Sequence, residues 1–304
     1  MEKIVCRAIT GPTASGKSAL ALRLAREMGW EILCMDSMQV YRRMDIGTAK
    51  PTAEERRLVP HHLLDLLDPR DSFSVSEYRE AAEETMRRLR EEGKPFLFVG
   101  GTALYLQALM HPMAMGQVPA NPALREELRR LAEEPGGRQE LSMRLRRLDP
   151  ETADRLPLND VRRIIRAIEV SEATGIPFSR QPVRETPDGA EWKVVSTAME
   201  RSVLYGRINA RVGEMLRLGL AREVESLLEE GVPEDVQSMQ GLGYKEMIPC
   251  VRGECTAEEA AERIRTGTRH YAKRQMTFLR REEKIRYVNT ESPDAYDEVR
   301  RILE

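Results

Sequence analysis

Short apolar runs alternate with amphipathic segments in the first hundred residues. Three runs are typical of buried strands: residues 4–10 (IVCRAIT), 31–36 (EILCMD) and 95–102 (PFLFVGGT). Between the first two, residues 17–28 place Leu20, Leu24 and Met28 on one helical face, and Gly29 stands where helices commonly end. Strands that are apolar on both faces, alternating with helices, predict a mostly parallel sheet covered by helices on both sides.

The sequence also marks the start of a helix before the third run. Ser74 and Glu77 have the spacing of a capping box, while Phe73 and Tyr78 have that of a hydrophobic staple. We therefore expect a helix that begins after Ser74 and reaches Gly93. In such a fold, ligands bind at the carboxyl ends of the parallel strands. Residues 11–18, Asp36 and Thr102 should meet at that edge.

The character of the chain changes between residues 119 and 187. Asn121 before Pro122, and Asp149 before Pro150, each have the pattern of a helix cap and a first helical residue, and Arg-rich helical segments follow both. We predict a helical insertion domain over 119–187 that divides a phosphate-loop core into residues 1–118 and 188–304. The sheet should resume near EWKVVSTAM (191–199), after a loop over 180–192.

The last third reads as helical and becomes strongly basic. Between Glu262 and Arg286 there are nine basic residues and three acidic ones, interleaved with His270, Tyr271 and Phe278. Cations combined with aromatic rings can hold phosphates and stack bases, whereas the alternative is a solvated helix face. The one-sided excess favours nucleic acid.

Composition narrows the class of protein. The 304 residues exceed what one core usually covers, and with 41% hydrophobic and 32% charged residues they describe a soluble protein. The net charge of -2 neither predicts nor excludes a polyanionic partner. Four cysteines lack zinc-site spacing, and no apolar run approaches the ~20 residues that span a bilayer. We expect a cytoplasmic protein with reduced thiols, no membrane contact and a monomeric state.

One motif carries strong chemical information. Gly11, Gly16, Lys17 and Ser18 fit the phosphate-loop pattern between a strand and a helix, the context that this motif requires. Its backbone N–H groups cradle phosphates, its lysine reaches the terminal phosphate, and Ser18 can touch Mg²⁺. The motif does not say whether the rest of the ligand is a nucleotide such as ATP.

Other candidate residues each allow more than one role. Asp36 suits a general base, a metal-binding carboxylate, or a helix cap paired with Gln39. Thr102 suits either substrate orientation or capping of the next helix. His61 and His62 have no third ligand nearby and indicate a structural pair rather than a metal site. Residues 241–246 (GLGYKE) fit either a backbone contact to a polyanion or a plain turn.

The ordered motifs GPTASGKS, DSMQVYR, DIGTAKPT, GGTALY, RRIIRAIEV, GLGYKE and YAKRQMTFLR resemble those of the tRNA dimethylallyltransferases over nearly the whole chain. The resemblance implies transfer of a dimethylallyl group from dimethylallyl diphosphate to N6 of the adenosine on the 3′ side of the anticodon. It also implies Mg²⁺ and a target base flipped out of the anticodon loop. Departures are modest: Ser18, Ala103 and Phe278 stand where many members have Thr, Gly and Trp.

The resemblance also assigns residues by position. The catalytic set would be Asp36 as general base, Thr102 near the reacting adenine, and Arg207. The diphosphate would be held by Gly11, Thr13, Ala14, Ser15, Gly16, Lys17 and Ser18. The tRNA anticodon stem-loop would contact Asp36, Ser37, Met38, Gln39, Thr102, Arg125, Arg162, Arg163, Arg166, Gly243, Tyr244, Lys245, Lys273, Arg274, Gln275, Phe278 and Arg280.

Two other functions fit part of the sequence. A phosphate-loop kinase with an Arg-rich lid predicts ATP turnover that depends on Lys17 and no RNA binding. A nucleotide-gated RNA-binding protein without catalysis predicts that Asp36→Asn leaves its activity intact.

Overall fold

The computed structural model describes residues 4–113, 118–185 and 190–304. The chain divides into two compact units, one made of residues 1–110 and 187–304 and the other of residues 111–186. The smaller unit lies where the sequence predicts a helical insertion over 119–187, and it begins earlier, at His111. Part of the loop predicted over 180–192, residues 186–189, lies outside the described residues.

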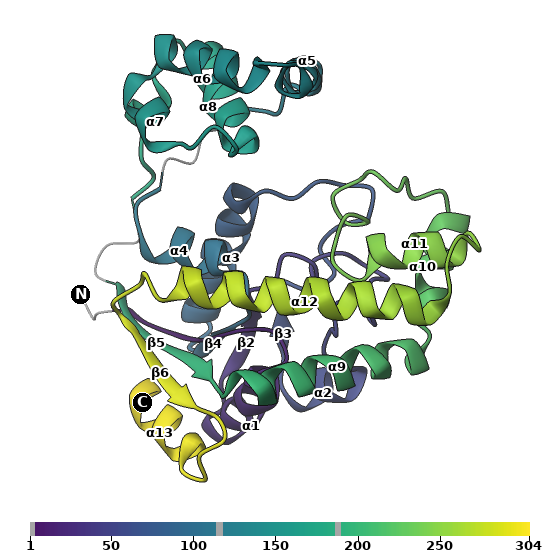
Figure 1. Ribbon diagram of the computed structural model, residues 1–304. Coiled ribbons are helices and arrows are strands. Elements are labelled where there is room, and N and C mark those ends of the chain that lie inside the picture. Colours follow the sequence, from purple (N-terminus) through teal and green to yellow (C-terminus); the bar gives the residue numbers. More distant parts are fainter. Residues whose placement is uncertain (1–3, 114–117, 186–189) are drawn as a thin grey trace. The chain divides into compact units, whose positions relative to one another are not determined.

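The larger unit is built on a parallel sheet with the strand order β3-β2-β4-β1-β5-β6 (Figure 1). Its strands are β1 Ile4–Thr10, β2 Glu31–Cys34, β3 His61–His62, β4 Phe96–Val99, β5 Ala190–Ala198 and β6 Ile285–Asn289. The predicted α/β class and the strands predicted near residues 4–10, 31–36, 95–102 and 191–199 are confirmed.

The last third is mainly helical, as predicted, but it also contains a strand that was not predicted: β6 pairs with β5 at the edge of the sheet. Of its five residues only Ile285 and Val288 are buried, so it lacks the continuous apolar run that marks the inner strands. The two-residue β3, at the opposite edge, is too short to leave any periodic pattern.

Helices cover both faces of this sheet, as the sequence predicts. On one face, α1 Lys17–Met28 and α13 Ala295–Leu303 contribute Leu24 and Val299 to a core with Ile9, Leu97 and Val195 of the strands. A larger core on the other face is built from α3 Val75–Glu91, α4 Ala103–Met110, α9 Arg201–Leu218, α10 Leu220–Glu229, α11 Tyr244–Val251 and α12 Ala257–Leu279. The short α2, Ala53–Leu58, precedes β3.

The predicted helix start before residue 75 is confirmed in detail. The Ser74 hydroxyl accepts the Glu77 N–H at 3.2 Å, and the Glu77 carboxylate accepts the Ser74 N–H at 2.7 Å. Phe73 and Tyr78 are both buried in the same core cluster. The two hydrogen bonds satisfy backbone N–H groups that the start of the helix would otherwise leave without a partner.

The smaller unit is helical, with α5 Pro122–Glu133, α6 Gly137–Leu148, α7 Pro150–Arg155, α8 Val161–Thr174 and a short 3₁₀ turn at Phe178–Arg180. Asn121 and Asp149 cap α5 and α7, as their spacing predicts. Its own core contains Leu128, Leu141, Leu145, Ile164 and Ile168. A bridge between Met113 and Arg184 joins the two ends of this unit.

Across the described ranges, no helix is both long and apolar enough to cross a membrane. The four cysteines are free thiols, with Cys6 and Cys34 buried.

The carboxyl ends of β2 and β4 approach so closely that they accommodate only glycine at residue 100. A Cβ atom there would lie 2.0 Å from the Met35 carbonyl oxygen, which belongs to the backbone and cannot rotate away. We expect Gly100→Ala to lower the free energy of unfolding by about 1–3 kcal/mol in urea titrations. In the control Gly213→Ala, in α9, the added Cβ meets nothing within 4 Å. That helical substitution should be neutral or stabilising by up to about 1 kcal/mol, and equal losses for both variants would contradict the packing argument.

Candidate functional site

The loop between β1 and α1 has backbone torsions that explain its two glycines. Gly11 has φ +134°, and a Cβ atom there would lie 2.1 Å from the Thr197 Oγ1 of β5. Gly16, at the N-terminus of α1, has φ +86°. Residues other than glycine rarely adopt this left-handed backbone conformation. The motif therefore forms a tight loop whose N–H groups precede a helix N-terminus, which is an anion-binding arrangement.

Contacts from distant strands hold this loop. The Ser15 and Thr197 hydroxyl oxygens are 2.6 Å apart, and Thr197 Oγ1 donates to the Thr10 carbonyl at 3.2 Å. The Thr290 hydroxyl, just after β6, donates to the Ser15 carbonyl at 3.3 Å. Because Thr197 and Thr290 follow Ser15 by 182 and 275 residues, the sequence motif alone gives no sign of them.

Cations converge on the same loop. The Lys17 Nζ donates to the Pro12 carbonyl at 3.3 Å. Burial, followed by repulsion from Arg211, lowers the pKa of Lys17 to about 8, while nearby Asp36 opposes the shift. Arg207 and Arg211 are one turn apart on α9: Arg207 flanks Gly16, and Arg211 Nη1 lies 3.5 Å from Thr13 Oγ1. Three cations around one loop are suited to an anion of more than one charge.

Asp36 follows β2 and lines the same pocket as Lys17. Its Oδ1 accepts the Met38 N–H at 2.9 Å, and among the described residues no group donates to Oδ2. No helix begins here, so the helix-cap alternative for Asp36 and Gln39 is wrong. Gln39 instead donates to the carbonyls of Thr48 at 3.0 Å and Ala49 at 3.2 Å. A carboxylate with one free oxygen facing a pocket is available to accept a proton.

The segment that contacts Gln39 is anchored by a carboxylate of α10. Glu223 accepts the backbone N–H groups of Asp45, Ile46 and Gly47 at 2.8–3.0 Å, and its Oε1 also accepts the Tyr244 hydroxyl at 2.7 Å. A Cβ atom at Gly47 would lie 2.6 Å from the Tyr244 ring. The DIGTAK motif thus forms a fixed wall for the pocket.

Thr102 joins the ends of β2 and β4. Its Oγ1 accepts the Ser37 N–H at 3.0 Å rather than an N–H of α4, so the side chain does not cap that helix. The Tyr271 side chain of α12 lines the same pocket as Asp36 and Gln275. Ser37 and Thr102 therefore lie side by side next to Asp36, as the resemblance implies.

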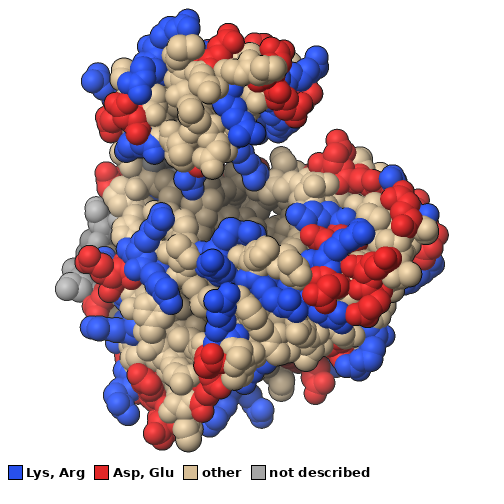
Figure 2. All heavy atoms as spheres, in the orientation of Figure 1, with Lys and Arg blue, Asp and Glu red and all other residues tan. Residues whose placement is uncertain are grey.

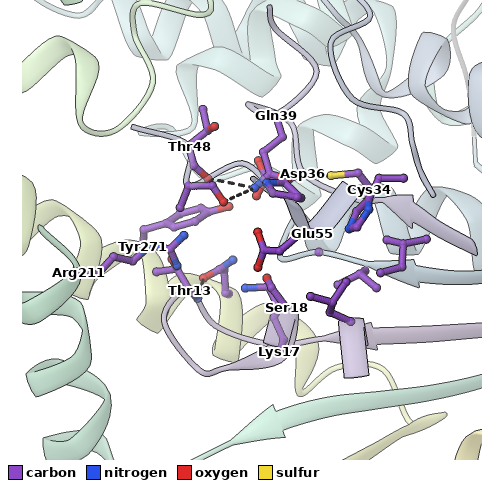
Figure 3. A pocket seen from close by; sticks show the side chains of 18 residues that line it. Thr13, Lys17, Ser18, Cys34, Asp36, Gln39, Thr48, Glu55, Arg211 and Tyr271 are labelled. Atoms are coloured by element: carbon purple, nitrogen blue, oxygen red, sulfur yellow. Dashed lines mark hydrogen bonds between the residues drawn. The ribbon is translucent and has the colours of Figure 1, made fainter. Parts of the chain in front are cut away.

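Lys17, Asp36, Gln39, Arg211 and Tyr271 line one open pocket of the larger unit, of about 830 Å³ including the space open to solvent (Figure 3). Arg207 lies next to Gly16, and Ser37 and Thr102 lie next to Asp36, but these three residues are not part of the lining. Figure 3 shows Lys17, Ser18, Asp36, Gln39 and Tyr271 around the same space. Six polar or ionisable lining residues were not predicted as site residues: Cys34, Thr48, Glu55, His61, Arg211 and Tyr271. The four-residue spacing of Arg207 and Arg211 is the one local signal that could have revealed Arg211.

Two residues expected to contact tRNA are buried in the larger unit. Gln275 is 5% exposed, accepts the Thr13 N–H at 2.9 Å and donates to the Gly101 carbonyl at 2.7 Å. Tyr244 is fully buried against Glu223 and Gly47. Both side chains are therefore occupied inside the protein, and the expected contact of these two residues with tRNA stays a prediction.

The exposed face of α12 and the turn after it carry cations (Figure 2). Figure 2 shows Lys and Arg gathered over the part of the larger unit that α12 and α9 cross. Lys273, Arg274 and Arg280 are exposed and form no ion pair with any described residue. By contrast, Arg265 and Arg269 pair with Glu258 and Glu262, so part of the basic excess is neutralised. Phe278 is half-buried between these cations, and Lys245 is exposed after Gly243.

In the smaller unit, two of the arginines expected to contact tRNA hold a buried carboxylate. Arg125 pairs with both oxygens of Glu169 at 2.8 Å, and Arg166 pairs with Glu169 at 2.5 Å. Although burial opposes it, hydrogen bonds from Arg125, from the Asn121 N–H and from Arg166 lower the pKa of Glu169 to about 2. Arg162 and Arg163 are exposed on α8.

Within the described ranges, no three His, Cys, Asp or Glu residues cluster as metal ligands. His61 contacts the Val59 carbonyl at 2.7 Å, and His62 contacts Glu31 at 2.6 Å.

Comparisons with known proteins agree on one family. Residues 39–282 match the IPP transferase family, and residues 4–66 match the isopentenyl transferases. The chain is 46% identical to the tRNA dimethylallyltransferase of Desulforudis audaxviator (strain MP104C), over 93% of this chain and 91% of that relative. It is 43% identical to the enzyme of that name from Shouchella clausii (strain KSM-K16), over 95% and 92%.

Solved structures agree. The full-length tRNA isopentenylpyrophosphate transferase of Bacillus halodurans matches with a TM-score of 0.71 and 38% identity, over 100% of this chain and 96% of that one. A eukaryotic dimethylallyltransferase acting on tRNA matches with a TM-score of 0.77 and 26% identity, over 98% and 78%.

The lowered pKa of Lys17 gives anion binding a pH dependence. Below pH ~8 the Lys17 ammonium is already charged in the free protein. Above pH ~8 the side chain is mostly neutral, so Lys17 must take up a proton when an alkyl diphosphate binds. We expect the affinity, measured by calorimetry, to be level up to about pH 7.5 and to fall about tenfold per pH unit above about pH 8. Lys17→Met should bind more weakly at every pH and lose this slope. The same slope in Lys17→Met would assign the proton to another group.

Proposed function

The chain belongs to the tRNA dimethylallyltransferase family, and we propose that it transfers a dimethylallyl group from its diphosphate to N6 of the adenosine 3′ to the anticodon in tRNA, releasing diphosphate. The observation that carries this proposal is that the phosphate loop and the free oxygen of Asp36 face one pocket. The pocket therefore combines a diphosphate cradle with a proton acceptor.

The strand ends argue against a phosphoryl-transfer enzyme. Phosphate-loop nucleotidases use an apolar strand that ends in Asp to hold the metal, whereas β4 is followed by Gly100 and Gly101. Asp36 follows β2 and is next to Ser37 and Thr102 instead. A carboxylate beside the Ser37 and Thr102 hydroxyls, at the carboxyl ends of two strands, suits an acceptor that loses an N–H proton.

In the proposed reaction, N6 of adenine attacks C1 of the dimethylallyl group while the bond from C1 to the diphosphate oxygen breaks. The exocyclic amine is a weak nucleophile because its lone pair is delocalised into the ring. Asp36 accepts the N6 proton during attack. Lys17, Arg207 and Arg211, with the N–H groups of the loop, stabilise the negative charge that develops on the departing diphosphate.

The residues around Asp36 would form the adenine pocket. Ser37 and Met38 follow Asp36, and Thr102 contacts Ser37. Gln39 lines the pocket and is held by the Thr48 and Ala49 carbonyls. A stacked base cannot reach Asp36, so the target adenosine must be extruded at a cost of a few kcal/mol, about what RNA contacts elsewhere can offset.

The donor set of the pocket fits Mg²⁺. This ion prefers oxygen ligands and is commonly held by one or two protein oxygens together with substrate phosphates and water. The Ser18 hydroxyl, which lines the pocket beside Lys17, would hold it with the diphosphate oxygens. When bound, Mg²⁺ would neutralise part of the diphosphate charge.

The tRNA would contact exposed cations of both units: Lys245, Lys273, Arg274 and Arg280 of the larger, and Arg162 and Arg163 of the smaller. Arg125 and Arg166 would support that surface through Glu169. Phe278 would offer an aromatic face, and the backbone of Gly243 lies beside Lys245. We propose action as a monomer in the cytoplasm, where free thiols persist.

Transfer can be measured directly with labelled dimethylallyl diphosphate, Mg²⁺ and unmodified tRNA that has adenosine 3′ to its anticodon. We expect wild-type protein to label the tRNA, and Asp36→Asn to label it about 100-fold or more slowly at unchanged donor affinity, because the proton acceptor is lost. Substituting that adenosine should abolish labelling. No transfer, but ATP consumption that depends on Lys17, would favour a kinase instead.

The exposed cations of α12 should contribute to RNA affinity through phosphate contacts. We expect Lys273→Gln and Arg280→Gln each to weaken tRNA binding, and to reduce the slope of log affinity against log salt concentration by about 0.7–0.9 per lost contact. Filter binding from 50 to 300 mM KCl, roughly the range over which such slopes are resolved, provides the measurement. The matched control is Arg265→Gln, whose side chain is paired with Glu258 and Glu262; a slope unchanged by all three substitutions would contradict this surface.

A further inference from the structure

The inner face of α12 connects two sides of the pocket that the chain builds from separate segments. Gln275 accepts the Thr13 N–H of the phosphate loop at 2.9 Å with Oε1, and its Nε2 donates to the Gly101 carbonyl at 2.7 Å. Tyr271, one turn earlier on α12, lines the same pocket. Thr102, which follows Gly101, accepts the Ser37 N–H next to Asp36. The Gln275 amide thus bridges the phosphate loop and the segment after β4 that contacts the Asp36 side of the pocket.

The fit around this amide is close. Gln275 is 5% exposed, and a Cβ atom at Gly101 would lie 2.3 Å from its Nε2 and 3.3 Å from the Gly11 carbonyl oxygen. The two glycine-containing loops therefore approach each other closely, and the Gln275 amide packs against both. An amide is the side-chain group that offers a donor and an acceptor at this reach without charge. A methionine of similar length would leave both backbone groups unsatisfied.

We propose that Gln275 is a positioning residue rather than a contact to tRNA. It fixes the phosphate loop relative to the proposed adenine pocket around Asp36, Ser37 and Thr102. The inference rests on the proposed function and deepens it. Transfer requires C1 of the donor to lie about 3–3.5 Å from the attacking N6, and the two reactants are held by different loops. The Gln275 amide holds the Thr13 N–H and the Gly101 carbonyl in a fixed relative position. The outward cations Lys273 and Arg274, on the same helix, serve RNA instead.

Two substitutions at Gln275 separate its two hydrogen bonds. Gln275→Met removes both, whereas Gln275→Glu keeps an acceptor for the Thr13 N–H and loses the donor to the Gly101 carbonyl. The matched control is Lys273→Met on the exposed face of α12. The readouts are kcat, KM for dimethylallyl diphosphate, the dissociation constant for tRNA by filter binding, and the dissociation constant for dimethylallyl diphosphate by calorimetry without tRNA.

We expect Gln275→Met to lower kcat about 10-fold or more and to raise both donor constants about 5- to 10-fold, because the reacting atoms are no longer held in register. Its tRNA dissociation constant should stay within about twofold of wild type, and Gln275→Glu should have a smaller loss of donor affinity. Lys273→Met should show the reverse pattern, with weaker tRNA binding and unchanged donor binding.

Weakened tRNA binding in Gln275→Met, with kcat and donor binding unchanged, would overturn the proposal and make Gln275 an RNA contact. Loss of every readout together with a lower thermal midpoint in both Gln275 variants would also overturn it, because the residue would then serve stability alone. If wild-type protein binds dimethylallyl diphosphate but transfers nothing to tRNA, the proposed function fails. The donor-binding measurement still tests the Gln275 contact in that case.

Discussion

The rest of the site depends on the close approach between the phosphate loop and the segments that surround it. Gly11 touches Thr197 of β5, Ser15 is held by Thr197 and Thr290, and the Thr13 N–H is held by Gln275. These contacts leave no room for side chains larger than hydrogen at Gly11 and define where the N–H groups point. A preformed loop is what an anion site needs, because the cost of ordering it is already met by folding.

The electrostatics of the pocket are unbalanced in the free protein. Lys17, Arg207 and Arg211 surround the loop, while Asp36 is the acid that acts on both Lys17 and Arg211. Burial disfavours the charged form of Lys17, so the site holds unfavourable electrostatic free energy until an anion binds. A bound diphosphate neutralises these cations, so the acceptor meets a site that the donor has already completed electrostatically.

Features that depend on residue spacing within a short segment could be predicted from the sequence. The phosphate loop, the Ser74 capping box, the caps Asn121 and Asp149, and the placement of Asp36 and Thr102 at one edge all follow from spacing. Arg211, Tyr271 and Thr197 did not, because their roles come from topology that brings distant segments together. Gln275 and Tyr244 stand in motifs that resemble RNA-contacting segments, yet only packing shows that their side chains are turned inward. Strand β6 was missed because an edge strand needs few apolar residues.

The order of the chain and the order of the sheet are strongly interleaved. The central β1 lies between β4 and β5, β6 closes the edge beyond β5, and the Arg7 Nε donates to the Leu303 carbonyl, the second residue from the C-terminus. The hydroxyl that supports the Ser15 carbonyl is 275 residues further along the chain. During synthesis, the phosphate loop is therefore translated early, whereas the residues that hold it, Thr197 and Thr290, are translated much later. Contacts of such long range are slow to form, so the loop reaches its binding geometry only after the segment around Thr290 has been synthesised and packed.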